Sequence, residues 1–142
     1  MIRILALDVG TVRIGVALSD PLGMTAQPLE VIHRRKIDCF SRIAAIVSEN
    51  EVQQMVVGLP LTLSGESGLA VESVELFVEE LKKHVTIPIE FWDERLTTAE
   101  AERAMIAGGS RRNKRKNAID RIAATLILQS FLDARQTECF SG

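Results

Sequence analysis

Residues 2–19 read IRILALDVGTVRIGVALS, and this stretch decides the fold. Residues 2–7 are nearly all apolar, which predicts a central strand that is covered on both faces and ends at Asp8. Gly10 is expected to adopt a positive φ in a tight connection. Apolar residues then alternate with small or polar ones up to residue 19, so the next strand is expected to pair with the first as a hairpin.

The rest of the chain alternates between short apolar runs and amphipathic segments. The pattern predicts further strands over residues 28–33, 55–59 and 87–92, an amphipathic helix from Ile37 to about Asn50, and a second helix with Val71, Val74, Val78 and Leu81 on one face. A strand, a helix and a strand in succession imply a right-handed crossover and parallel pairing.

Two more helices are expected in the last third of the chain. Thr97 followed by Glu100 is a capping-box pattern for a third helix, which two consecutive glycines stop. Asn117 can cap a long helix that runs to about Ala134 and carries apolar residues on nearly all sides. Together these elements predict an α/β fold, with a sheet of about five strands and helices on both faces.

Length and composition suit one domain that spans residues 1–142. The chain is 46% hydrophobic and 25% charged, and at this length a core needs no disulfide. Cys39 and Cys139 lack metal-ligand spacing, so we interpret them as reduced thiols. No apolar run approaches the length of about 18 residues that a membrane span requires, so we expect a cytoplasmic protein with no membrane partner.

One segment of the chain carries a clear excess of positive charge. The protein carries −2 overall, yet residues 104–119 contain five bases and no acid, which leaves −7 on the remainder. These bases are Arg111, Arg112, Lys114, Arg115 and Lys116. Such a segment on an otherwise acidic protein can contact a polyanion, so we regard it as a candidate nucleic-acid-binding segment; a solvated loop is the alternative. Aromatic residues are too scarce to predict a base-stacking platform.

Four acids stand where an α/β sheet places its ligands. Asp8, Asp93 and Glu94 follow predicted strands, and Asp120 lies in the predicted last helix. One acid from each strand end and one from the helix would form a cluster of charge about −3, which would repel itself without divalent cations. We therefore expect two Mg²⁺ or Mn²⁺ ions, about 4 Å apart, that support hydrolysis of a phosphodiester bond.

Each of these features also has a structural alternative. Asp8 can accept backbone N–H bonds within a turn, the pair after the last strand can form a salt bridge with Arg95, and Asp120 can favour its own helix dipole. A glycine-containing loop follows the strand over residues 55–59. It includes the candidate substrate-loop residues Gly58, Pro60 and Gly65, which either allow a nucleic-acid backbone to approach closely or merely join a strand to a helix.

Four ordered motifs resemble the YqgF/RuvX family over nearly the whole chain. They are Asp8-Val9-Gly10 with Arg13-Ile14-Gly15-Val16-Ala17, Val56-Val57-Gly58-Leu59-Pro60, Asp93-Glu94-Arg95-Leu96-Thr97, and Ala118-Ile119-Asp120-Arg121-Ile122-Ala123-Ala124. The resemblance implies an RNase H-like fold with strand order 3-2-1-4-5 and an antiparallel second strand. It also implies a bacterial nuclease, similar to Holliday-junction resolvases of the RuvC type, with Asp8, Glu94 and Asp120 as catalytic metal ligands. Asp93 is the alternative to Glu94 as a ligand.

The leading hypothesis is a metal-dependent endonuclease that processes the 5′ end of pre-16S ribosomal RNA. Resolution of Holliday junctions in branched DNA is the alternative, and a non-catalytic RNA-binding module is the alternative of another class. An actin-like ATPase is disfavoured, because that architecture needs two such domains. A monomer suffices to cut one RNA end, whereas symmetrical cleavage of a junction favours a homodimer.

Overall fold

The five strands form one mixed sheet. The computed structural model describes residues 3–60, 68–93 and 123–135. Their elements are β1 (Ile4–Val9), β2 (Arg13–Ser19), β3 (Ala26–His33), α1 (Cys39–Glu49), β4 (Gln54–Leu59), α2 (Leu69–Leu81) and β5 (Ile89–Asp93). Residues 123–135 are helical and are called the C-terminal helix below. The strand order β3-β2-β1-β4-β5 confirms the order that the family resemblance implies.

Strand direction defines two ends of this sheet. β2 is antiparallel to both β1 and β3, whereas β1, β4 and β5 run parallel to one another. The last residues of β1, β4 and β5 therefore lie at the same end as the start of β2 and the finish of β3. We call this the carboxyl end of the sheet.

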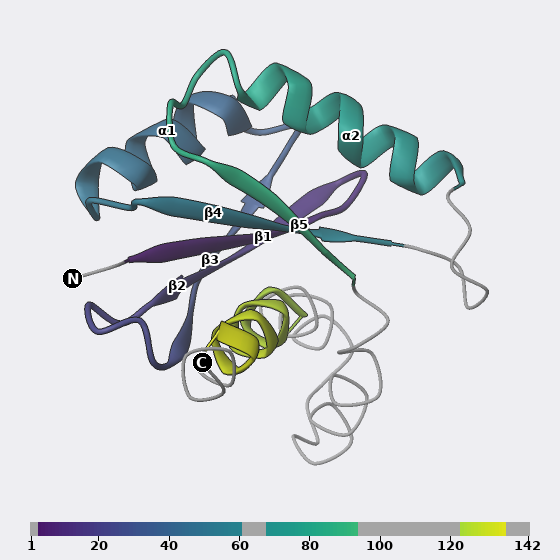
Figure 1. Cartoon of the computed structure of the whole chain (residues 1–142). Coiled ribbons are helices and arrows are strands. Elements are labelled where there is room, and N and C mark those ends of the chain that lie inside the picture. The colour runs from purple at the N-terminus through teal and green to yellow at the C-terminus, as the bar shows by residue number, and fades with distance from the viewer. Residues whose placement is uncertain (1–2, 61–67, 94–122, 136–142) are drawn as a thin grey trace, which may run out of the picture.

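Helices cover both faces, as the sequence predicts (Figure 1). α1 and α2 lie on one face, and the C-terminal helix lies on the other. Leu5 and Leu7 of β1 pack in the α1–α2 layer, whereas Ile4 and Ala6 pack with the C-terminal helix. All four are fully buried, which explains why this strand is apolar at nearly every position.

Hydrogen bonds attach the C-terminal helix to both edges of the sheet. The Gln129 side chain accepts a bond from the backbone N–H of Ala26, the first residue of β3, at 2.9 Å. On the other side, the indole N–H of Trp92 in β5 donates to the Ser130 hydroxyl at 3.1 Å. The Trp92 ring also meets Phe131 edge-on, with 5.5 Å between ring centroids.

Within the described ranges, no helix is long and apolar enough to cross a lipid bilayer.

Three local predictions are corrected. β1 continues beyond Asp8 to Val9, so Asp8 lies inside the strand. Gly10 does not have a positive φ; it is needed because a Cβ there would stand 2.7 Å from the carbonyl oxygen of Arg13. Gly58 is a buried residue of β4 rather than part of the following loop, because it pairs in register with Trp92.

The first helix begins later than its apolar pattern suggests. Ile37 stays 46% exposed because Asp38 caps the helix, and the buried positions are Cys39, Ile43 and Ile46. Arg42 of this helix is half-buried and pairs with Glu30 of β3 at 2.6 Å. The predicted third helix and the start of the predicted last helix lie outside the described residues.

Candidate functional site

Asp8 is a half-buried carboxylate on the face of the C-terminal helix. Side chains alternate along a strand, and Ile4 and Ala6 pack on this face, so Asp8 belongs to it as well. Its position near the carboxyl end of the central strand is the place where ligands bind in open α/β sheets. The structure therefore places this acid where the sequence predicts a site.

The residues on either side of Asp8 have no side chains. Gly15 of β2 pairs directly with Asp8. On β4, Val57 pairs with Leu7, so the next residue, Gly58, lies beside Asp8. Both glycines are buried, and neither places a Cβ atom beside the carboxylate. Sequence reasoning missed Gly15, because its role depends on a pairing register that a single strand does not reveal.

A carboxylate without side chains beside it on the neighbouring strands suits a hard cation. Mg²⁺ and Mn²⁺ prefer oxygen ligands, and Mg²⁺ keeps several waters when it binds. A carboxylate flanked by glycines can accept an ion with its waters, whereas flanking apolar side chains would exclude them. The Asp8 position thus fits the metal chemistry that the sequence predicts.

Asp93 belongs to the opposite face of the sheet. It pairs with Leu59, and Leu59 packs against the α1–α2 layer. Ile89, four residues earlier in β5, packs against that layer too, whereas Trp92 packs with the C-terminal helix. Strand alternation therefore separates the Asp93 side chain from the face that carries Asp8.

Most of the other predicted site residues lie outside the described ranges. These are Glu94, Asp120, the basic residues Arg111, Arg112, Lys114, Arg115 and Lys116, and Gly65 of the substrate loop. Within the described ranges, no group of three or more His, Cys, Asp or Glu side chains is placed to hold an ion. Pro60 directly follows β4 at the carboxyl end of the sheet.

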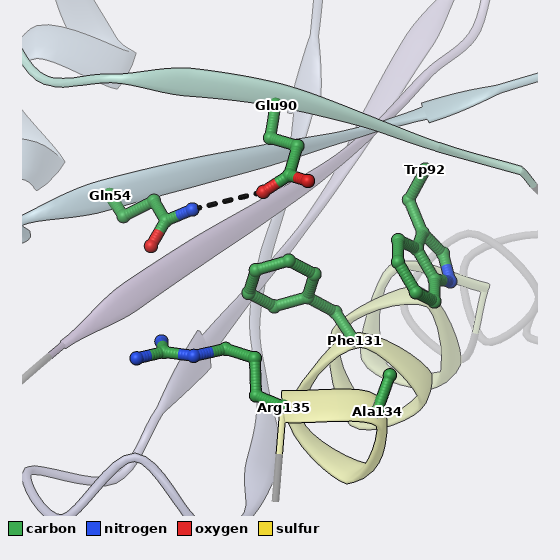
Figure 2. Close-up of a pocket in the computed structure, with 6 residues that line it drawn as sticks. All are labelled: Gln54, Glu90, Trp92, Phe131, Ala134 and Arg135. Carbon is green, nitrogen blue, oxygen red and sulfur yellow. Dashed lines mark hydrogen bonds between the residues drawn. The ribbon is translucent and has the colours of Figure 1, made fainter. Parts of the chain in front are cut away.

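A pocket of about 290 Å³ lies on the same face but toward the opposite end of the sheet (Figure 2). It is lined by Gln54, Glu90, Trp92, Phe131, Ala134 and Arg135. The Gln54 amide donates to the Glu90 carboxylate at 3.2 Å, as the dashed line in Figure 2 shows. Gln54, at the start of β4, precedes Gly58 by four residues, roughly 13 Å along the strand. Trp92, at the other side of the pocket, pairs with Gly58 and so lies level with Asp8, across β4.

Comparison with known proteins gives a match over nearly the whole chain. The family described as RuvX, Holliday junction resolvase, matches residues 2–134. A protein of Desulforamulus reducens named "Putative pre-16S rRNA nuclease" is 49% identical over 133 residues, which covers 93% of this chain and 97% of that protein. A Listeria monocytogenes protein with the same name is 46% identical over 134 residues, with 92% and 97% covered.

Solved structures share the fold at low sequence identity. RuvC of T. thermophilus, in complex with a Holliday junction substrate, has a TM-score of 0.54 and 16% identity, and the match covers 96% of each chain. The fowlpox virus Holliday junction resolvase has a TM-score of 0.55 and 11% identity, with 94% of this chain and 99% of that one covered. The similarity to these solved structures shows an RNase H-like fold. The family match over residues 2–134 and the relatives at 46–49% identity show that the chain belongs to the RuvX family.

Proposed function

We propose that the protein is a divalent-metal-dependent endonuclease that processes the 5′ end of pre-16S ribosomal RNA in the cytoplasm. The observation that carries this proposal is the Asp8 carboxylate, held between Gly15 and Gly58 at the carboxyl end of the central strands. The names of the relatives at 46–49% identity supply the substrate. One copy of the chain is enough to cut a single RNA end.

Three carboxylates form the proposed metal site: Asp8, Glu94 and Asp120. Two bound Mg²⁺ or Mn²⁺ ions would activate water and stabilise the leaving oxygen. The backbone of Asp8 is fixed by its place in β1. Because Asp93 belongs to the other face, we expect the side chain that follows it, Glu94, to turn toward Asp8.

The length of a glutamate side chain suits this arrangement. β4 separates β1 from β5, so their backbones are roughly 10 Å apart. Gly58 of β4 lies between them and leaves that gap open to an ion and a phosphate group. The side chain of Glu94 reaches farther across the gap than an aspartate would.

Two segments are proposed to hold the RNA near these acids. The bases Arg111, Arg112, Lys114, Arg115 and Lys116 precede Asp120 closely in the chain and would contact backbone phosphates. The loop after Pro60, with Gly65, would let the RNA backbone approach the metal site.

The direct test is cleavage of a pre-16S leader RNA by wild type and by Asp8→Asn. The amide keeps the shape of the side chain but removes its charge. If the metal site stabilises the transition state by several kcal/mol, its loss lowers the cleavage rate by about a hundredfold or more. Unchanged circular dichroism would verify the fold. An Asp8→Asn protein that cleaves at the wild-type rate would refute the site.

A second pair of variants tests which acid of the 93–94 pair serves the site. Glu94→Gln is expected to lose cleavage as Asp8→Asn does, whereas Asp93→Asn keeps activity within a few-fold, because its side chain is on the α1–α2 face. Single-turnover rates at saturating Mg²⁺ measure both variants. The reverse pattern would show that strand alternation breaks at the end of β5.

Branched DNA is the second candidate substrate, because the family description names Holliday junction resolution. A four-way DNA junction in the same assay, beside the leader RNA, decides between the two. Binding of RNA without cleavage, unaffected by Asp8→Asn, would instead favour the non-catalytic module.

A further inference from the structure

A second group of cations lies at the carboxyl end of the sheet, on the side of β1 away from β4. Arg13 begins β2, and His33, which pairs with it, ends β3. Arg34, Arg35 and Lys36 follow directly. The two strands bring these residues beside the Asp8 end of β1, although they lie far in sequence from the basic segment over residues 111–116.

Arg13 shares a face with Asp8. Ile14 and Ile32 pack in the α1–α2 layer, so their neighbours Arg13 and His33 face the other way. Gly15 pairs with Asp8, and Arg13 precedes Gly15 by two residues on the same strand. Diagonal neighbours of this kind are about 7–8 Å apart, which an arginine side chain spans easily.

Arg34 fixes the turn after β3 against the connection between β1 and β2. Its backbone N–H donates to the carbonyl of Val12 at 3.0 Å, and its guanidinium donates to the carbonyl of Gly10 at 2.8 Å. The same guanidinium lies over the Phe77 ring, 5.1 Å from the centroid. Arg34 therefore has a structural role, and it holds the next two residues at the end of the sheet.

Arg35 and Lys36 are exposed and available for an external anion. Neither side chain forms an ion pair with any residue in the described ranges. The contrast with other bases is clear: Arg42 pairs with Glu30, and Lys82 and Lys83 pair with acids one helical turn away. The nearby carboxylate of Asp38 is engaged as the cap of α1.

We propose that Arg35 and Lys36, beside Arg13, form a second phosphate-contact surface, which guides the substrate strand from Asp8 across the ends of β2 and β3. The direction of this path rests on the proposed role of Asp8, whereas the anion binding itself does not. β1 and β3 are two strand spacings apart, roughly 10 Å. With a rise of about 3.4 Å per phosphate of one strand, that distance accommodates about three phosphates.

The test measures binding and does not depend on cleavage. The probe is a fluorescein-labelled RNA hairpin with a single-stranded 5′ extension, titrated by anisotropy in EDTA between 50 and 200 mM KCl. The variant is the double substitution Arg35→Ala with Lys36→Ala. The matched control is Lys82→Ala with Lys83→Ala, which removes the same charge just after α2, where both side chains already pair with acids.

Loss of two phosphate contacts lowers the slope of log affinity against log salt by about 1.4 for single-stranded and about 1.8 for double-stranded contacts. Raising the salt fourfold weakens binding of the wild type by some factor. For the variant at residues 35 and 36, this factor is expected to be roughly tenfold smaller. The control keeps the wild-type slope. Equal slopes for the variant and wild type, or an equal fall in the control, would overturn the proposal.

The cleavage assay separates this surface from the proposed function. If wild type fails to cut the leader RNA in Mg²⁺ but the salt slopes differ as expected, the surface stands and the nuclease assignment fails. If wild type cuts the RNA and the slopes are equal, the nuclease assignment stands and the surface fails.

Discussion

Glycines near Asp8 provide space in two different ways. Gly15 pairs with Asp8 across the β1–β2 ladder, where any side chain would stand beside the carboxylate. Gly10 instead brings two backbone segments together: its N–H donates to the Arg13 carbonyl at 2.9 Å. Neither glycine has a positive φ, and at Gly10 the requirement for glycine is steric.

Gly10→Ala is expected to destabilise the protein by about 1–3 kcal/mol, because the new Cβ would meet the backbone carbonyl of Arg13 at 2.7 Å. The β1–β2 connection would have to shift to relieve this contact. Urea denaturation followed by circular dichroism measures the change in the free energy of unfolding.

Gly68→Ala is the control for Gly10→Ala. Gly68 caps α2, and a Cβ there would meet no atom within 4 Å. Alanine is a poorer cap than glycine but lowers the entropy of the unfolded chain, so the two effects nearly cancel. Equal destabilisation by both substitutions would show that the contact with Arg13 is not the cause.

The two helices of the α1–α2 layer begin differently. The Asp38 carboxylate accepts hydrogen bonds from the backbone N–H groups of Phe40 and Ser41 and from the Ser41 hydroxyl, the last at 2.8 Å. α2 begins at Gly68, which offers no side-chain cap, although Glu72 in its first turn favours the helix dipole. The start of α1 therefore has a titratable side-chain cap, whereas that of α2 has no side-chain cap.

Asp38→Ala is expected to lower the Tm at neutral pH, because two backbone N–H groups lose their acceptor. The Ser41 hydroxyl, followed by its backbone N–H, holds the pKa of the Asp38 carboxyl below its ordinary value of 3.8. A pKa lowered by folding contributes stability above the unfolded value and loses it as the pH falls through the folded value.

The Tm difference between wild type and Asp38→Ala should therefore stay constant from pH 7 to about pH 5 and shrink below pH 3.8. Differential scanning calorimetry over this pH range measures it. A difference that grows on acidification would contradict the capping role. Ser41→Ala, which removes only the hydroxyl donor, should give a smaller effect with the same sign.

At the scale of the molecule, the sheet joins two apolar layers, which share no side chain among the residues that the structure describes. Leu7 lies in the layer of α1 and α2, and Leu128 lies in the layer of the C-terminal helix. The layers are coupled through the strands themselves, and Gln129 and Trp92 attach the C-terminal helix to β3 and β5. We therefore expect one cooperative unfolding transition.

Leu7→Ala and Leu128→Ala test this coupling, since both side chains are fully buried. Each is expected to cost about 2–5 kcal/mol and to shift the whole transition to lower urea. Trp92 is the single tryptophan, so its fluorescence reports on the C-terminal helix while far-ultraviolet circular dichroism reports on the whole fold. Fluorescence that changes before circular dichroism in Leu128→Ala would show that the two layers unfold separately.

Local sequence determined most of the elements and their order. Short apolar runs and the spacing of apolar residues predicted all five strands and both helices of the α1–α2 layer, because burial leaves a pattern with the period of the element itself. The motif around Asp8 also placed that acid near the end of the central strand. These features depend on residues close together in the chain.

Only the tertiary structure decided which side chains meet across strands. The pairing of Gly15 with Asp8, the placement of Asp93 with Leu59 on the opposite face, and the approach of Arg34 to Gly10 all depend on register. A shift of one residue in pairing would reverse the face of every side chain, and no single strand encodes its partner's register. The sequence alone thus determined which groups are available for chemistry, and the folding of distant segments decided which of them share a site.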